Sequence, residues 1–297
     1  MMVSLLFAVS ACPSKVDMGF VNLGWFKVVI LGIVQGITEL LPISSTAHLR
    51  VVPALLGWPD PGSAFSAAMQ LASLAAVITY FWQDIKELTG ATVRAITNRN
   101  YRSGSFRLVM GLLMGTVPIV LAGLLFEKKL NECHSPFRSL TVVGIACIVM
   151  SLLLALAEKQ GKHNREFNQL RLQDGIWVGI AQAFALVPGV SRSGSTLTAG
   201  IFLRMERETA ARFSFLLGIP AVILAGGKEL YTLFKAGLDV NGWLILLIGL
   251  ISASISAFLA IYGLLHYLEK RSTWIFVWYR LALGVFLLVG VGRGFLR

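Results

Sequence analysis

Two polar stretches decide how this chain folds: QGITELLPISSTAH at residues 35–48 and QAFALVPGVSRSGST at residues 182–196. Each interrupts an otherwise apolar segment, and the second follows the first by about 147 positions. An ionised side chain at membrane depth costs about 2.5–3.5 kcal/mol on insertion scales, so polar residues there are candidates for a functional site. The first stretch carries Gln35, Glu39, Ser44, Ser45, Thr46 and His48, and the second carries Ser191, Arg192, Ser193, Ser195 and Thr196.

The composition excludes an ordinary soluble domain. Of the 297 residues, 56% are hydrophobic and only 14% are charged, whereas soluble domains contain about 25% charged residues. The formal charge of +11 does not indicate a nucleic-acid partner. Lys and Arg lie in short connections between apolar segments, where orientation in a bilayer explains them. The sequence therefore predicts an all-α polytopic membrane protein.

Six apolar stretches are long enough to cross a hydrocarbon core of about 30 Å. Segments 24–57 and 175–203 are different, because Pro, Gly and hydroxyl residues break each of them midway. Backbone outside a helix is tolerated at membrane depth only where protein or water surrounds it, so both segments are predicted to be re-entrant helix-turn-helix hairpins. The six predicted spans cover residues 65–83, 106–126, 138–157, 211–234, 242–265 and 275–295.

The order of these elements predicts an inverted-topology repeat. A re-entrant hairpin returns to its own side and three spans follow it, so the second half begins on the opposite face. We expect repeats at about 24–157 and 175–296 within a single domain, residues 21–297, whose two broken loops meet near mid-membrane. Residues 1–20 are given no role in the fold.

The distribution of Lys and Arg predicts the orientation. Fourteen lie in segments 84–107, 158–174, 204–212 and 266–274, which share one side, and nine lie on the other side. The positive-inside rule makes the first side cytoplasmic and places both termini outside. Arg280, near the start of the last span, is expected either to extend toward the interface or to line a cavity.

Hydroxyl residues precede the second helix of each hairpin. A side chain at Ser44 or Ser45, and at Ser191 or Ser193, is suited to cap that helix at its N-terminus. Capping explains one serine in each loop, but it leaves the charged residues of the loops unexplained.

Two helix N-termini that converge from opposite faces favour an anion, particularly phosphate. Arg192 adds a planar fork that matches phosphate oxygens, and Gly189 and Gly194 allow the backbone to approach closely. The second loop therefore has the composition of an anion-binding site.

The first loop carries groups suited to chemistry. Gln35 and Glu39 are four residues apart and share one face of a helix. Glu39 is suited to act as a general base or to hold Mg²⁺, which takes one or two carboxylates together with substrate phosphates. His48 is suited to activate a hydroxyl or to protonate a leaving group. The alternative for His48 is a polar residue satisfied inside the bundle.

The Gln35/Glu39 pair with PISSTAH, together with PGVSRSGST at 188–196, resembles the BacA-type undecaprenyl-diphosphate phosphatases. The likeness runs from about Gly24 to the C-terminus. It implies an integral hydrolase of the bacterial plasma (inner) membrane that removes the terminal phosphate of undecaprenyl diphosphate. Such enzymes recycle the lipid carrier of peptidoglycan synthesis and confer bacitracin resistance, and their fold has inverted repeats with two re-entrant hairpins.

The resemblance also implies roles for residues. Ser45 is the leading candidate for the nucleophile, His48 is a competing nucleophile or acid/base, and Glu39 is an acid/base or metal-associated group. A divalent cation, Mg²⁺ or Ca²⁺, is expected at Glu39 and Gln35, although the family has Glu or Gln at the first position and Gln35 leaves one carboxylate fewer. The implied diphosphate-binding residues are Arg192, Ser191, Ser193, Gly194, Thr196, Ser44 and Thr46.

The expected partners are a prenyl diphosphate and membrane lipids, with no nucleic acid and with a homodimer left open. The site is expected to face outward. A secondary transporter is the main alternative, because inverted repeats with broken helices are typical of that class. A structural or assembly protein is the third, and it predicts that the polar residues of the loops are replaceable. The concentration of Glu39, Ser45, His48 and Arg192 in two short loops favours the enzyme.

Overall fold

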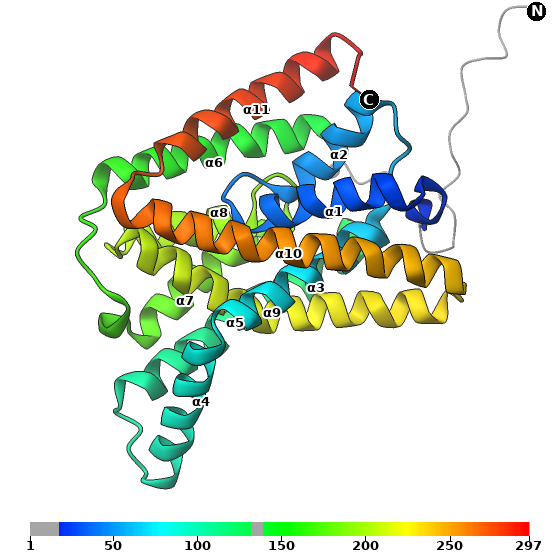
Figure 1. Ribbon diagram of the computed structural model, residues 1–297. Coiled ribbons are helices and arrows are strands. Elements are labelled where there is room, and N and C mark those ends of the chain that lie inside the picture. The colour runs from blue at the N-terminus through cyan, green and yellow to red at the C-terminus, as the bar shows by residue number, and fades with distance from the viewer. Residues whose placement is uncertain (1–17, 132–138, 297) are drawn as a thin grey trace, which may run out of the picture.

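The computed structural model describes residues 18–131 and 139–296, which form an almost entirely helical protein (Figure 1). Within these residues, β geometry is confined to an isolated bridge between Arg165 and Met205. In this described part of the chain, the short 3-10 helices η1 (Gly19–Leu23), η3 (Phe167–Gln169) and η4 (Phe184–Leu186) accompany the α-helices. The α-helices are α1 (Trp25–Leu40), α2 (Ser45–Leu56), α3 (Ser63–Tyr80), α4 (Trp82–Thr97), α5 (Gly104–Asn131), α6 (Leu140–Gln160), α7 (Leu172–Ala183), α8 (Arg192–Phe202), α9 (Arg207–Lys235), α10 (Val240–Lys270) and α11 (Trp274–Gly292).

The predicted membrane class is confirmed. Among the described helices, α5, α6, α9, α10 and α11 are each long and apolar enough to cross a membrane. The sixth predicted span is α3, which qualifies only together with α4, and the two are bent by 73° at Phe81. The expectation that residues 84–107 form a connection is wrong for α4, which is a helix over Trp82–Thr97. The charged residues of α4 are typical of a connecting loop, but they belong to an amphipathic helix. This helix projects away from the body of the molecule (Figure 1).

Both predicted hairpins are present. α1 ends at Leu40, a short turn through Pro42 follows, and α2 begins at Ser45. α7 ends at Ala183, continues as η4, and the chain turns before α8 begins at Arg192. Pro42 and Pro188 contribute to these breaks because proline cannot donate a backbone hydrogen bond and disfavours helix in the residue before it.

The two hairpins enter from opposite ends of the molecule, as predicted. The outer ends of α1 and α2 lie near the α9–α10 connection, because Phe20, Trp58 and Leu238 belong to one apolar cluster. The outer ends of α7 and α8 lie at the other end. There the N–H groups of Asn164 and Arg165 both donate to the carbonyl of Arg204 at 3.0 Å. The repeat is therefore inverted.

The packing of the helices follows the inverted repeat, because the first helix of each hairpin packs against a helix of the other repeat. α1 packs along α10, and α7 packs along α5, so each hairpin lies against a span of the other repeat. Small residues allow these contacts. A Cβ on Gly36 would lie 2.3 Å from the carbonyl oxygen of Ala253, and one on Gly179 would lie 2.1 Å from that of Gly115. Close approach at small residues is how membrane helices associate, because lipid provides no hydrophobic force between them.

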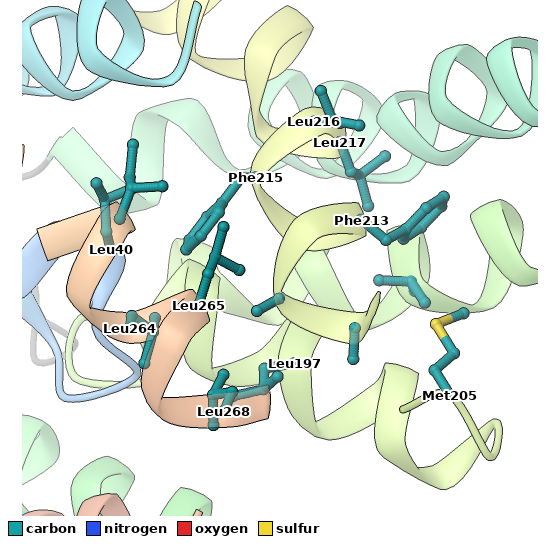
Figure 2. Packing of buried hydrophobic residues seen from close by; sticks show 14 of the residues in the cluster. Leu40, Leu197, Met205, Phe213, Phe215, Leu216, Leu217, Leu264, Leu265 and Leu268 are labelled. Atoms are coloured by element: carbon teal, nitrogen blue, oxygen red, sulfur yellow. The ribbon is translucent and has the colours of Figure 1, made fainter. Parts of the chain in front are cut away.

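One apolar cluster surrounds the inner ends of both hairpins. Leu40 at the end of α1 and Leu197 in α8 both belong to it, together with Phe215 of α9 and Leu264 of α10. Figure 2 shows Leu40, Phe215 and Leu264 around this region. The hairpin tips are thus held inside the bundle rather than at its surface.

The four basic segments predicted to share one side do meet at one end. Glu158 at the end of α6 accepts hydrogen bonds from Arg207 Nε at 2.9 Å and from Thr273 Oγ1 at 2.8 Å. Arg212 in α9 pairs with Asp84 in α4. These contacts join residues from all four segments.

Arg165 and Asp174 form a further ion pair at this end of the molecule, with Nη2 and Oδ2 2.6 Å apart. Hydrogen bonds to Asp174 raise the pKa of the Arg165 guanidinium. The pair fixes the start of α7, because Asp174 also accepts a bond from the backbone N–H of Arg171.

The N-terminal region needs one correction. Residues 1–17 lie outside the described part of the chain, but Phe20 is fully buried and its ring lies 5.5 Å from that of Phe65. A role for residues 1–20 in the fold was not expected, and this is wrong for Phe20. A single aromatic residue before the first span gives no periodic signal. The division of the remaining chain into one domain with two repeats at about 24–157 and 175–296 stays a prediction.

Replacing Gly179 with Val is expected to destabilise the protein. The added side chain would collide with the backbone of Gly115, which cannot move without separating α5 from α7. Overpacking costs about 1–3 kcal/mol or more, so the midpoint of heat-induced aggregation in detergent should fall clearly. Gly123→Val is the matched control, because a Cβ there meets nothing within 4 Å. Equal midpoints for the two variants would contradict the close crossing.

Candidate functional site

The tips of the two hairpins are in direct contact. Ser193 Oγ donates to the carbonyl oxygens of Glu39 at 3.1 Å and Leu41 at 3.0 Å. Arg192 Nη2 lies 3.5 Å from Glu39 Oε1. The acidic loop and the cationic loop therefore form one site, as the sequence predicted.

Glu39 is the centre of this site. Its Oε2 accepts hydrogen bonds from Gln35 Nε2 at 2.9 Å and from Ser45 Oγ at 2.6 Å, and its side chain is only 6% exposed. Gln35 reaches it from one turn earlier on α1, and Ser45 reaches it from the first residue of α2. The Oε1 atom of Gln35 is buried without a protein partner. A serine hydroxyl thus already donates its hydrogen to a carboxylate.

Ser44 and Ser191 occupy equivalent positions, immediately before α2 and α8. Both have positive φ, 74° and 69°, which is uncommon for a residue other than glycine and indicates local strain. Ser191 Oγ caps α8 by accepting from the N–H of Gly194 at 3.2 Å, which confirms one of the predicted caps. Ser44 makes no such bond, and its hydroxyl is buried without a partner. The backbone N–H groups at the start of α2 therefore receive no capping hydrogen bond from the side chain of Ser44.

The guanidinium of Arg192 lies against Gly218 of α9, where no side chain covers the backbone. A Cβ on Gly218 of α9 would lie 1.7 Å from Arg192 Nη1, so only glycine leaves room for the guanidinium. The Nε and Nη1 atoms of Arg192 are buried without a protein partner. A guanidinium with unused donors beside a helix N-terminus is suited to bind a phosphate group.

His48 is turned away from Ser45. Its Nδ1 lies 2.7 Å from the carbonyl oxygen of Ser44, and its Nε2 lies 2.6 Å from the hydroxyl of Tyr279. Because a carbonyl only accepts, Nδ1 carries the hydrogen, and Nε2 of the neutral ring accepts from Tyr279. The two rings are stacked with centroids 5.6 Å apart. Tyr279 was not among the residues expected at the site, because its only signal in the sequence is a polar group in an apolar span.

Arg280 links the backbones of both tips. It is 1% exposed, its Nη1 donates to Pro42 at 3.1 Å, and its Nη2 donates to Gly189 and Val190 at 2.9 Å. A Cβ on Gly194 would lie 2.4 Å from Nη1. Arg280 neither extends to the interface nor lines an open cavity, so both expectations for it were wrong. The buried carbonyls of the two breaks supply the acceptors that hold it inside.

The remaining predicted residues divide into two groups. Ser195 Oγ and Thr196 Oγ1 donate to the carbonyl of Arg192 at 3.0 and 2.7 Å, and Thr196 also contacts Ser214. These hydroxyls brace α8. Thr46 is exposed, and Ser45, Ser191 and Arg192 are partly exposed. The role of each residue in binding diphosphate stays a prediction.

A divalent cation at this site would depend on oxygen ligands from the protein. Within residues 18–131 and 139–296, there is no group of three or more His, Cys, Asp or Glu side chains that could hold a metal ion. Glu39 and the unpartnered Oε1 of Gln35 offer two oxygens. This set fits a hard cation that takes its other ligands from water and from substrate phosphates, as Mg²⁺ commonly does.

These features define a class: a polytopic helical membrane protein in which two inverted hairpins bring a serine, a carboxylate and a guanidinium together. The family described as "Bacitracin resistance protein BacA" matches residues 28–286. This chain belongs to that family.

Curated relatives are similar over nearly the whole chain. "Undecaprenyl-diphosphatase 2" of Mesorhizobium japonicum is 58% identical over 262 residues, which are 88% of this chain and 99% of that relative. "Undecaprenyl-diphosphatase" of Trichormus variabilis is 51% identical over 289 residues, 97% of this chain and 90% of the relative. The protein of the same description from Synechocystis is 53% identical over 276 residues, 93% of this chain and 85% of the relative.

Gly218→Ala is expected to disable the site without unfolding the protein. The added methyl would overlap Arg192 Nη1, and the flexible end of that side chain can move away from Glu39. A misplacement of about 1 Å costs roughly a hundredfold in rate. The measurement is phosphate release from a prenyl diphosphate, with thermal stability measured in parallel.

Gly227→Ala, in the same helix, is the matched control, because a Cβ there meets nothing within 4 Å. Wild-type turnover by both variants would show that the position of Arg192 against Gly218 does not matter.

Proposed function

We infer that this protein is a membrane phosphatase that hydrolyses undecaprenyl diphosphate to undecaprenyl phosphate and inorganic phosphate. The observation that carries this conclusion is the 2.6 Å hydrogen bond from Ser45 Oγ to Glu39 Oε2 beside Arg192. The names of the relatives, undecaprenyl-diphosphatases at 51–58% identity, give the substrate. The product is the lipid carrier of peptidoglycan synthesis, and its regeneration accounts for the bacitracin resistance in the family's description.

The diphosphate group binds between the two hairpin tips in this proposal. The N-terminus of α2, whose N-cap side chain makes no capping bond, provides backbone donors and a positive dipole end. Arg192 provides a fixed charge with unused donors from the other side. Preorganised donors in a site with little water stabilise charge developing on a phosphoryl group, and one such donor is worth about 3 kcal/mol.

Ser45 is the nucleophile in the proposed reaction. Glu39 takes the proton from Ser45 Oγ, which attacks the terminal phosphorus. The bond from that phosphorus to the bridging oxygen breaks, and undecaprenyl phosphate leaves with the electron pair. Glu39 gives this proton to the departing undecaprenyl phosphate and is then a base again. Water attacks the phosphorus of the phosphoserine and gives a proton to Glu39, the bond from phosphorus to Ser45 Oγ breaks, and Glu39 returns the proton to Ser45 Oγ as inorganic phosphate is released.

His48 is a positioning residue in this mechanism. Both ring nitrogens are engaged, one with Ser44 and the other with Tyr279. By binding the carbonyl of Ser44, His48 holds the strained residue that sets the direction of Ser45. The geometry thus favours Ser45 over His48, a choice that the sequence left open.

A divalent cation, Mg²⁺ or Ca²⁺, is proposed to enter with the diphosphate. Glu39 and Gln35 Oε1 would hold it, and it would neutralise phosphate charge when bound. Glu39 is the only carboxylate proposed for this role, so most of the remaining ligands would come from the substrate and water.

The proposed location is the bacterial plasma membrane. The end that carries the contacts among Glu158, Arg207, Arg212 and Asp84 is assigned to the cytoplasm because basic residues gather there. The termini and the opening of the site are assigned to the outer side. The charge distribution supports this orientation.

Ser45→Ala and His48→Ala should differ in how much activity they lose. Loss of the nucleophile should lower the rate of phosphate release from undecaprenyl diphosphate at least about a thousandfold. Loss of the positioning histidine should lower it by about a hundredfold. A rapid acid or alkaline quench of the wild type should place the phosphoryl label on Ser45, as read by mass spectrometry.

The controls are Ser66→Ala and His266→Ala, which remove the same groups away from the site and should retain wild-type rates. Label on His48, or a greater loss with His48→Ala than with Ser45→Ala, would exchange the two roles. Vesicles that take up an anion without any release of phosphate would favour the transporter instead.

A further inference from the structure

An apolar groove of about 740 Å³ runs along α10. One wall comes from the exposed face of α1, including Ile33 and Ile37, and another comes from Phe276 at the start of α11. The floor is formed by α10. Ligand-binding pockets commonly have volumes of about 300–1,000 Å³, so the groove has the size of a binding site.

The groove exists because α10 presents small residues where its neighbours end. Ser252, Ser256, Ala260 and Gly263 recur along one side of the helix and line the groove. α1 lies beside α10 at Ser252 and Ser256, but it ends at Leu40, where the chain turns into α2. Past Leu40, α1 no longer lies beside α10, and the small residues Ala260 and Gly263 there leave a trough between α10 and the start of α11.

The groove lies next to the polar site at Leu41. Leu41, in the break of the first hairpin, lines the groove with its side chain, while its carbonyl oxygen accepts the hydrogen bond from Ser193. Glu39 lies two residues earlier in the chain. An apolar groove and a site for a charged group are thus separated only by the turn at Leu41.

We propose that this groove binds the prenyl tail of the substrate next to its diphosphate group. The proposal rests on the function inferred above, and it names the part of the protein that recognises the tail. A lipid with a charged head and a long hydrocarbon chain needs an apolar channel that passes beside the catalytic groups, and the groove, which Leu41 lines part-way along its length, meets that requirement.

The dimensions of the groove suit a long tail. Its floor runs from Ser252 to Tyr267, sixteen residues of helix, whose ends are roughly 22 Å apart at a rise of 1.5 Å per residue. This exceeds half of a hydrocarbon core of about 30 Å. A chain of several isoprene units can lie along it, whereas a tail of two units has little to contact beyond Leu41.

Gly263→Leu tests the proposal because it places a side chain in the groove. A Cβ at Gly263 meets nothing within 4 Å, so the helix tolerates the change. Gly123→Leu on α5 is the matched control, with equally open surroundings. Phosphate release is measured for undecaprenyl diphosphate and for geranyl diphosphate, each in mixed micelles over a range of mole fractions.

With undecaprenyl diphosphate, Gly263→Leu should raise KM about tenfold at unchanged kcat, because the displaced hydrocarbon loses buried contacts. With geranyl diphosphate, and with Gly123→Leu on either substrate, values should match the wild type. Equal effects of Gly263→Leu on both substrates, or none on either, would overturn the proposal. A changed oligomeric state of Gly263→Leu would instead assign the groove to a second copy of the chain.

Photo-crosslinking provides a measurement that needs no variant. A polyprenyl diphosphate with a diazirine on its third isoprene unit should label α10 or the start of α11 in the wild type. Unlabelled undecaprenyl diphosphate should compete, and a phospholipid should not. Labelling spread over α5 and α6, or competition by phospholipid, would overturn the proposal. A wild-type protein that released no phosphate from either prenyl substrate would instead contradict the proposed function itself.

Discussion

The site depends on one buried guanidinium that binds the backbones of both hairpins. Arg280 donates to the carbonyls of Pro42 in one break and of Gly189 and Val190 in the other. A broken helix leaves carbonyl oxygens without partners, and at membrane depth each unsatisfied group costs several kcal/mol. One charged residue therefore satisfies acceptors from both breaks and holds the two tips at a fixed separation.

The fold brings two equivalent structures together and gives them different chemistry. Ser44 and Ser191 have the same strained φ before α2 and α8, and the next residues are Ser45 and Arg192. A hydroxyl in one repeat thus occupies the position of a guanidinium in the other. These two residues reach the same carboxylate: Ser45 Oγ donates to Glu39 Oε2, and Arg192 Nη2 lies 3.5 Å from Glu39 Oε1. In the proposed reaction, one copy of the turn supplies the nucleophile and the other supplies the charge that holds the diphosphate.

The sequence predicted the hairpins and the main site residues because polarity in an apolar chain has few explanations. Glu39, Ser45 and Arg192 stood out for this reason, and they do lie together.

Other features depended on contacts between segments far apart in the chain. Arg280 gave no local sign that its acceptors lie in both loops, and Gly218 resembled the other glycines of the membrane helices until Arg192 was placed against it. The same holds for the orientation of His48 toward Tyr279, whereas α4 was missed because its charges resemble those of a connecting loop.

The ion pair between Arg192 and Glu39 explains how the site can be stable without a ligand and still bind one. At 3.5 Å the contact is longer than a good charge-assisted hydrogen bond, and two donors of Arg192 are unused. A buried charge without any partner is strongly unfavourable, so the pair stabilises both groups at rest. In the proposed reaction, the diphosphate takes over Arg192 with better geometry, and Glu39 keeps its hydrogen bonds from Gln35 and Ser45, while the divalent cation would replace Arg192 as its charged partner. When the anion is bound, the carboxylate of Glu39 thus stays hydrogen-bonded to the hydroxyl of Ser45, whose proton Glu39 removes in the proposed reaction.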